Sequence, residues 1–172
     1  GQPVDTNSDT EVLLHAYLAW GEACLERLNG MFAFAIYDGR TESVFAARDR
    51  FGEKPLYLCE RGGSLYFASE MRALLKMPGV PSQPDPGAVH DYLAYRYVPA
   101  PRTLISGVRK LMPGTCALWQ FGRLREIRYW SAPDRDSWAR QSVGSDQARA
   151  SRGRAALRRA RLREPGRARQ PA

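Results

Sequence analysis

The chain has 172 residues with 44% hydrophobic content, which is enough for one domain with a buried core. It contains no apolar run near the ~18 residues of a membrane-spanning helix, and no secretory signal opens it, so we expect no membrane segment. Of the formal net charge of +8, +7 comes from residues 145–172, where nine arginines oppose Asp146 and Glu164. The first 144 residues are nearly neutral, and we do not expect the domain to bind nucleic acid.

The three cysteines, Cys24, Cys59 and Cys116, are too widely spaced for a C-x-x-C metal or redox motif. Their odd number also argues against a framework of disulfides. We therefore predict three small core residues in a reduced, cytoplasmic protein, and no metal site.

The first periodic segment follows the sequence S-D-T-E at residues 8–11. Ser8 and Glu11 have the spacing of a capping box, in which each side chain satisfies a free amide of the first helical turn. Apolar residues at helical spacing then predict a helix from Asp9 to about Trp20. A carboxylate at the first helical position is favoured by roughly 0.3–1 kcal/mol through the helix dipole. On these residues alone, Asp9 is explained by helix-start chemistry.

The middle of the chain predicts two hairpins. Seven consecutive apolar residues, 31–37, are too short for a helix and do not alternate, which is typical of a strand covered on both faces. Asp38-Gly39 is a hairpin turn signal, and residues 44–47 supply the returning strand. The second hairpin pairs residues 56–59 with 65–68. Strands covered on both faces need a sheet on one side and helices on the other, so the predicted fold class is layered α+β.

Short helices are predicted over residues 69–75 and 87–95, and a last hairpin pairs residues 116–121 with 124–130. We expect the second of these helices to bury Val89 and Leu93. The tyrosines near its end are open to two interpretations, base stacking or packing, and their proline-rich, nearly neutral surroundings favour packing. These tyrosines are Tyr92, Tyr95 and Tyr97.

Five sequence blocks stand out along the chain. They are S-D-T-E-V at 8–12, L-N-G-M-F-A-F-A at 28–35, R-D-R-F-G-E-K-P-L-Y at 48–57, F-A-S-E-M-R-A-L-L at 67–75 and Y-V-P-A-P-R-T at 97–103. With these blocks in this order, the chain resembles the glutaminase half of glutamine-dependent asparagine synthetases, the class II glutamine amidotransferases, over about residues 6–130. Five blocks in order are far more specific than any one of them.

The resemblance implies a role for Asp9. In the family, the aspartate of the S-D-x-E element holds the α-ammonium group of the substrate L-glutamine, and this position matches Asp9. Ser8 and Glu11 are then structural residues near the site. We expect Arg48 and Asp49 to be structural too, as an ion pair that fixes the loop near the glutamine site, and not catalytic.

The same resemblance implies a partial four-layer αββα sandwich of the N-terminal-nucleophile hydrolase type. Residues 1–132 are interpreted as a partial glutamine amidotransferase type 2 domain, and residues 133–172 as a linker and a disordered basic Arg/Ala-rich tail. The abrupt change in composition suggests a read-through in another frame or a truncated gene product. ATP and Mg²⁺ are implied for the full-length family, whose S-G-G-x-D-S loop is not found here, and no cofactor is expected for this segment.

The opening residues depart from the family pattern. Class II amidotransferases use an N-terminal cysteine, whose own amine is the general base and whose thiolate attacks the glutamine amide. This chain starts with Gly1, and the family's substrate-binding arginine and N-G-E element have no match in it. We therefore expect no catalytic residue in this chain and no glutaminase activity from it alone.

By the resemblance, the chain is part of a glutamine-hydrolysing asparagine synthase, a ligase that uses ammonia from glutamine for the ATP-dependent amidation of aspartate. The implied partners are L-glutamine, a synthetase domain and, in the full-length family, a second copy in a homodimer. Two alternatives stay open. One is a sibling amidotransferase with another acceptor, β-lactam synthetase-like or modifying sugars or peptides. The other is a non-catalytic scaffold whose basic tail binds nucleic acid or anionic surfaces.

Overall fold

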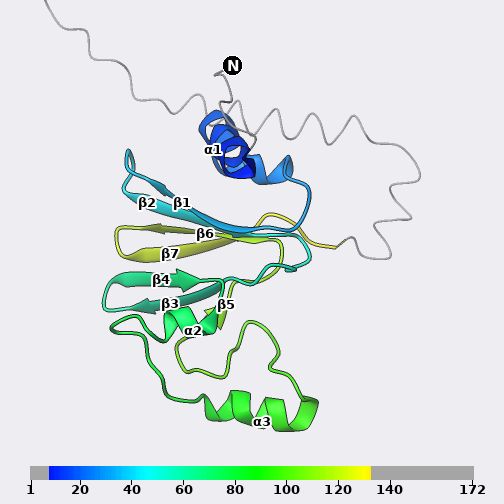
Figure 1. The fold of residues 1–172 in the computed structure, drawn as a ribbon, viewed down its shortest axis with the longest axis vertical. Helices are drawn as coiled ribbons and strands as arrows, with labels where there is room; N and C mark the ends of the chain where they lie inside the picture. The colour runs from blue at the N-terminus through cyan, green and yellow to red at the C-terminus, as the bar shows by residue number, and fades with distance from the viewer. Residues whose placement is uncertain (1–7, 133–172) are drawn as a thin grey trace, which may run out of the picture. The chain divides into compact units, whose positions relative to one another are not determined.

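The computed structural model of the protein describes residues 8–132 (Figure 1). The predicted linker and disordered tail over residues 133–172 lie outside the described residues, as does the segment 1–7. Between residues 8 and 132, no helix is both long and apolar enough to cross a membrane.

Helix α1, Asp9–Trp20, has the bounds that the sequence predicts. Ser8 is its N-cap, and the Ser8 Oγ accepts a hydrogen bond from the Thr10 N–H at 3.3 Å. Gly21 ends the helix with a φ of +57°, a conformation that costs glycine little because it has no Cβ. A 3₁₀ helix, η1, Gly21–Glu26, follows directly.

The larger sheet has four antiparallel strands in the order β1-β2-β6-β7 (Figure 1). Strands β1, Ala33–Asp38, and β2, Ser43–Arg48, form the first predicted hairpin. Strands β6, Thr115–Gln120, and β7, Arg123–Arg128, form the last predicted hairpin. The two hairpins join along β2 and β6 although they lie far apart in the sequence.

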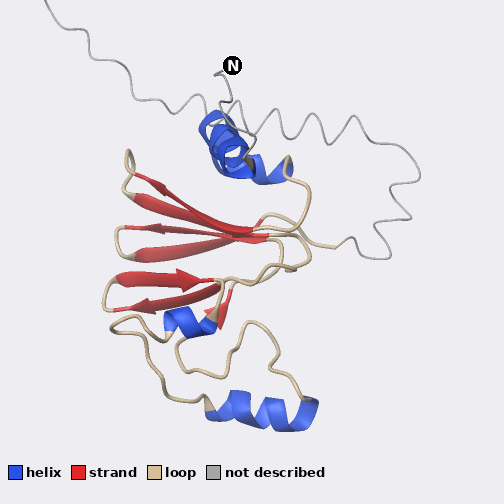
Figure 2. Cartoon of the chain, in the orientation of Figure 1, coloured by secondary structure: helices blue, strands red, loops and turns tan. Residues whose placement is uncertain are grey.

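The smaller sheet has three strands in the order β4-β3-β5. Strands β3, Tyr57–Arg61, and β4, Ser64–Ala68, are the second predicted hairpin, while the two-residue strand β5, Arg109–Lys110, was not predicted. Helix α2, Met71–Leu74, follows β4, and helix α3, Pro86–Tyr95, comes next along the chain (Figure 2).

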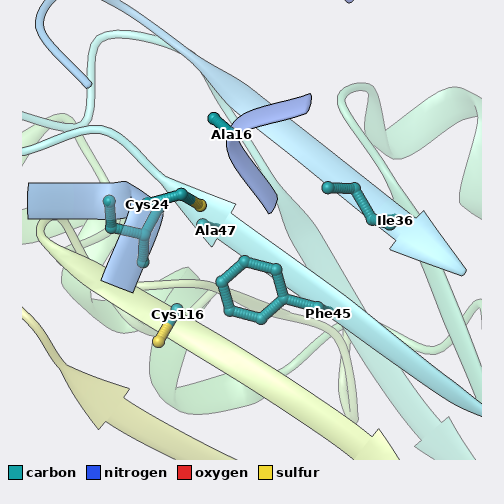
Figure 3. Packing of buried hydrophobic residues seen from close by; sticks show 7 residues of the cluster. Ala16, Cys24, Ile36, Phe45, Ala47 and Cys116 are labelled. Carbon is teal, nitrogen blue, oxygen red and sulfur yellow. The ribbon is translucent and has the colours of Figure 1, made fainter. Parts of the chain in front are cut away.

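Three buried clusters lie between successive layers. Phe45 and Ala47 of β2 pack in the cluster between the larger sheet and the helices α1 and η1 (Figure 3). The intervening Ala46 points to the opposite face and packs with Leu58 in the cluster between the two sheets. Leu74 of α2 lies in the third cluster, on the other side of the smaller sheet. The order helix, sheet, sheet, helix confirms an α+β fold and is consistent with the expected partial four-layer sandwich.

Helix α3 differs from its prediction in what it buries. Ala88 is fully buried, but Val89 is 38% exposed and Leu93 is 75% exposed. The prediction that this helix buries Val89 and Leu93 is therefore wrong. The physical reason is that α3 is held through a small side chain and through polar groups, with an Asp91 carboxylate oxygen 3.0 Å from an Arg102 guanidinium nitrogen.

The tyrosines around the end of α3 are exposed as well. The Tyr95 and Tyr97 rings lie 6.3 Å apart, yet both side chains are more than half exposed, and Tyr92 is nearly so. Their expected packing is thus not found within the described residues.

Candidate functional site

A concavity of about 480 Å³ lies beside the first hairpin. Its walls come from the start of α1, the turn that leads into β1, the first part of β1, the loop between β2 and β3, and the connection after β4. The charged residues of the lining are Asp9 and Lys54, from different walls. The remaining lining is mostly apolar, so the cavity combines an apolar surface with one charged side chain of each sign.

The structure places Asp9, the residue predicted to bind glutamine, on the lining of this concavity. Its side chain is exposed and has no ion-pair partner in the described part of the chain. Glu11, on the same helical turn, instead lies with its Oε1 3.6 Å from His15 Nε2. Neither Ser8 nor Glu11 lines the concavity. These two residues therefore belong to the helix start, and Asp9 belongs to both the helix start and the cavity.

One wall of the concavity is apolar. Leu13 of α1 lies on it together with Phe32 and Phe34, whose rings are 5.5 Å apart. The backbone reaches this wall through Gly30, whose φ of +124° is readily adopted only by glycine. Such a surface suits the methylene groups of an amino-acid side chain.

Another wall is the loop between β2 and β3, and Arg48 holds this loop in place. This residue is 9% exposed. Its guanidinium donates to three backbone carbonyl oxygens, those of Gly52 at 2.5 Å, Lys54 at 2.7 Å and Leu111 at 2.7 Å. Burial lowers the pKa of Arg48, although the charge of Asp49 opposes this effect. Arg48 thus joins two separate backbone segments, the β2–β3 loop and the segment at Leu111, through charge-assisted hydrogen bonds.

Asp49 holds the same loop from its other side. It is 1% exposed, and its carboxylate accepts backbone N–H groups of Phe51 at 3.1 Å, Glu53 at 3.0 Å and Lys54 at 3.0 Å. Burial by itself raises the pKa of this carboxyl group. The backbone N–H donors of the loop outweigh burial, so the pKa of Asp49 lies below its ordinary value.

The predicted ion pair between Arg48 and Asp49 is wrong, because no ion pair joins them among the described residues. Both still fix the loop, since backbone dipoles satisfy each buried charge in place of an opposite charge. They meet at Lys54, where Asp49 accepts from the N–H group and Arg48 donates to the carbonyl. This arrangement sets the backbone of Lys54 and Pro55 at a defined place on the cavity wall.

The amino-acid sequence matches a known protein family. The glutamine amidotransferase domain family matches residues 1–130. The chain belongs to this family. Asparagine synthetase [glutamine-hydrolyzing] 3 of Bacillus subtilis is 36% identical over 132 residues, which cover 76% of this chain and 22% of the relative.

Two further relatives have similar names. Asparagine synthetase [glutamine-hydrolyzing] 1 of Bacillus subtilis is 39% identical over 115 residues, covering 67% of this chain and 18% of the relative. Asparagine synthetase [glutamine-hydrolyzing] 2 of Arabidopsis thaliana is 50% identical over 70 residues, which cover 40% of this chain and 12% of the relative. The amidotransferase domain spans about a fifth of the length of the curated relatives from Bacillus subtilis.

The three cysteines of this amidotransferase domain are free and buried, as predicted. Burial raises the pKa of Cys24 and Cys59, and it raises the pKa of Cys116 to about 11. None of the three lines the concavity beside Asp9. The described residues therefore present no thiolate to a ligand in this cavity.

Sequence reasoning missed four polar residues of the cavity in the amidotransferase domain, Thr10, Asn29, Lys54 and Ser69. Each lies inside one of the blocks that carry the family resemblance, so the blocks marked the right segments. The convergence of Lys54 and Ser69 with Asp9 required the tertiary structure, because these residues come from the β2–β3 loop, the β4–α2 connection and the start of α1.

Proposed function

We propose that the concavity beside α1 binds L-glutamine and that the Asp9 carboxylate holds the α-ammonium group of this ligand. The observation that carries the proposal is the position of the Asp9 carboxylate at a capped helix start on the cavity lining. A charge-assisted hydrogen bond to such a group contributes about 1.5–3 kcal/mol. The apolar wall with Leu13 would contact the methylene groups of the ligand.

We infer that the domain acts within a glutamine-hydrolysing asparagine synthase. In that reaction the glutamine amide is hydrolysed to glutamate and ammonia, and the ammonia amidates aspartate in an ATP-dependent step. The names of the relatives support this inference. The free, buried cysteines support a reducing, cytoplasmic compartment.

The residues described here do not fit a site for ATP and Mg²⁺. Within residues 8–132, no three His, Cys, Asp or Glu side chains gather where they would hold a metal ion. Gly62-Gly63 forms the turn of the β3–β4 hairpin and is not followed by a helix that would receive phosphate groups. We therefore assign the ATP-dependent chemistry to another part of the full-length protein.

We propose further that the 172-residue polypeptide binds glutamine without hydrolysing it. Hydrolysis by this family's chemistry needs a reactive thiolate at the glutamine amide. The described cysteines are buried away from the cavity, and their pKa values are raised by burial.

Isothermal titration of the 172-residue chain with L-glutamine tests the binding. We expect Asp9→Asn to weaken affinity by about 10- to 100-fold, the equivalent of one charge-assisted hydrogen bond. Glu11→Gln is the matched control, because it removes a carboxylate from the same helical turn without touching the cavity lining. Equal affinities for the wild type and Asp9→Asn would show that Asp9 does not hold the ligand.

A glutamate-release assay with the same protein tests the absence of hydrolysis. We expect no glutamate above the rate of glutamine alone. Glutamate release that Asp9→Asn abolishes would show that the chain is a competent glutaminase.

A further inference from the structure

The cavity beside α1 is lined by a cation as well as by the Asp9 carboxylate. The cation is Lys54 of the β2–β3 loop, whereas Asp9 lies at the start of α1. Among the described residues, no ion pair includes either Asp9 or Lys54. The charges of the lining therefore call for a ligand that carries both a positive and a negative group.

The backbone of Lys54 is held at this wall from both sides. Its N–H donates to the Asp49 Oδ2 at 3.0 Å, and its carbonyl accepts a hydrogen bond from the Arg48 Nε at 2.7 Å. Both partners are buried side chains, and Pro55, the next residue, restricts the backbone of Lys54 further. The fold thus fixes the point from which the ammonium group extends, while the side chain itself can adjust to a ligand.

The nearest acidic residue along the chain does not neutralise Lys54. Glu53 precedes it on the same loop, and both residues are exposed. Glu53 does not line the cavity, and no ion pair joins it to Lys54 in the part of the chain that the structure describes. The charge of Lys54 is therefore available to a ligand in the cavity.

An α-amino acid carries an ammonium group and a carboxylate on the same carbon atom. An ammonium group held at Asp9 brings this carboxylate into the cavity, where it loses part of its water and requires a new partner. Lys54 is the only cation that lines the cavity within residues 8–132. Its ammonium has three donors on a flexible four-carbon stem, so it can reach a carboxylate without a fixed geometry.

We propose that Lys54 binds the α-carboxylate of the amino acid whose α-ammonium group is held by Asp9. The cavity then selects zwitterionic α-amino acids over ligands that lack either charge. This inference rests on the proposed function and deepens it, because it assigns the second charged group of the ligand to a residue. The cavity lining, with one charged side chain of each sign on different walls, is the observation that carries it.

Isothermal titration of the 172-residue chain with three ligands tests this assignment. L-Glutamine carries both charges, L-glutaminamide lacks the carboxylate, and glutaramate lacks the ammonium group. We expect Lys54→Met to weaken L-glutamine binding by about 5- to 10-fold and to change the affinity for L-glutaminamide by less than about twofold. Asp9→Asn should give the complementary result, with weaker binding of L-glutaminamide and unchanged binding of glutaramate.

Lys76→Met is the matched control, because Lys76 is exposed and does not line the cavity. It should leave all three affinities at the wild-type values. An unchanged affinity of Lys54→Met for L-glutaminamide also shows that this variant is folded, since the two proteins then share a working cavity.

Two outcomes overturn the role of Lys54. One is an equal affinity of Lys54→Met and the wild type for L-glutamine. The other is an equal loss of affinity for L-glutamine and L-glutaminamide, because such a loss does not depend on the carboxylate. In either case, weaker L-glutamine binding by Asp9→Asn would leave the proposed function standing. The absence of L-glutamine binding by the wild type would overturn the proposed function and this inference together.

Discussion

At the scale of single residues, the clearest feature is a pair of buried charges that are satisfied by backbone groups. Asp49 accepts three loop N–H groups, so Asp49→Asn would put an amide N–H group against one of these donors. We expect this change to lower the free energy of unfolding by about 1–3 kcal/mol, measured by urea denaturation. Asp91→Asn, at the partly exposed ion pair with Arg102, should cost less than about 1 kcal/mol. Equal costs for the two variants would contradict the role given to Asp49.

The cysteines provide a second prediction at this scale. Burial raises the pKa of all three thiols, to about 11 for Cys116, so little thiolate is present at pH 8. We expect a thiol reagent to modify the folded chain slowly and the urea-unfolded chain rapidly, with three thiols counted after unfolding. Rapid modification of one thiol in the folded chain would reveal a reactive cysteine.

At the scale of elements, Gly114 joins the last hairpin to the loop of the candidate site. Its N–H donates to the Asp49 carbonyl at 2.9 Å, and its own carbonyl accepts the Tyr129 N–H at 2.9 Å. Its φ is +64°, and a Cβ there would lie 2.5 Å from the Trp130 carbonyl oxygen. The close approach of these two segments therefore requires glycine.

Alanine substitutions at Gly114 and Gly122 separate backbone strain from steric overlap. Gly122→Ala carries the same positive-φ strain, of about 1–2 kcal/mol, but its Cβ meets no atom within 4 Å. Gly114→Ala adds a backbone clash, so we expect it to lower the melting temperature clearly more than Gly122→Ala does. Calorimetry of the two variants measures the difference, and equal melting temperatures would show that the segments move apart without cost.

At the scale of the whole molecule, the candidate site depends on residues far beyond its own lining. The cavity is built within residues 9–69, but the Tyr129 hydroxyl donates to the Arg48 carbonyl at 2.7 Å. We expect a chain that ends at Ala132 to bind glutamine as the full chain does. A chain that ends at Gln120 loses β7 and this hydrogen bond, and we expect it to lose cooperative unfolding as well as binding. Weaker glutamine binding by the chain ending at Ala132 would show that later residues contribute to the site.

The amino-acid sequence by itself determined the features that depend on short-range patterns. The bounds of α1 follow from its capping residues. The three hairpins follow from turn dipeptides, and the strands covered on both faces follow from uninterrupted apolar runs. The burial of the three cysteines follows from their small apolar character. The blocks of family resemblance predicted the correct family, and the role of Asp9 in binding glutamine stays a prediction.

Only the tertiary structure decided the features that depend on segments distant in sequence. In the structure, Arg48 and Asp49 bond to backbone groups and do not form the predicted ion pair. One of these groups is the carbonyl of Leu111, which is remote in the sequence. The tertiary structure left Val89 and Leu93 of α3 exposed, because helical spacing shows which residues share a face but not whether another layer covers that face. It brought Lys54 and Ser69 to the cavity of Asp9, because long-range packing places separate segments side by side and local residue patterns do not record this packing.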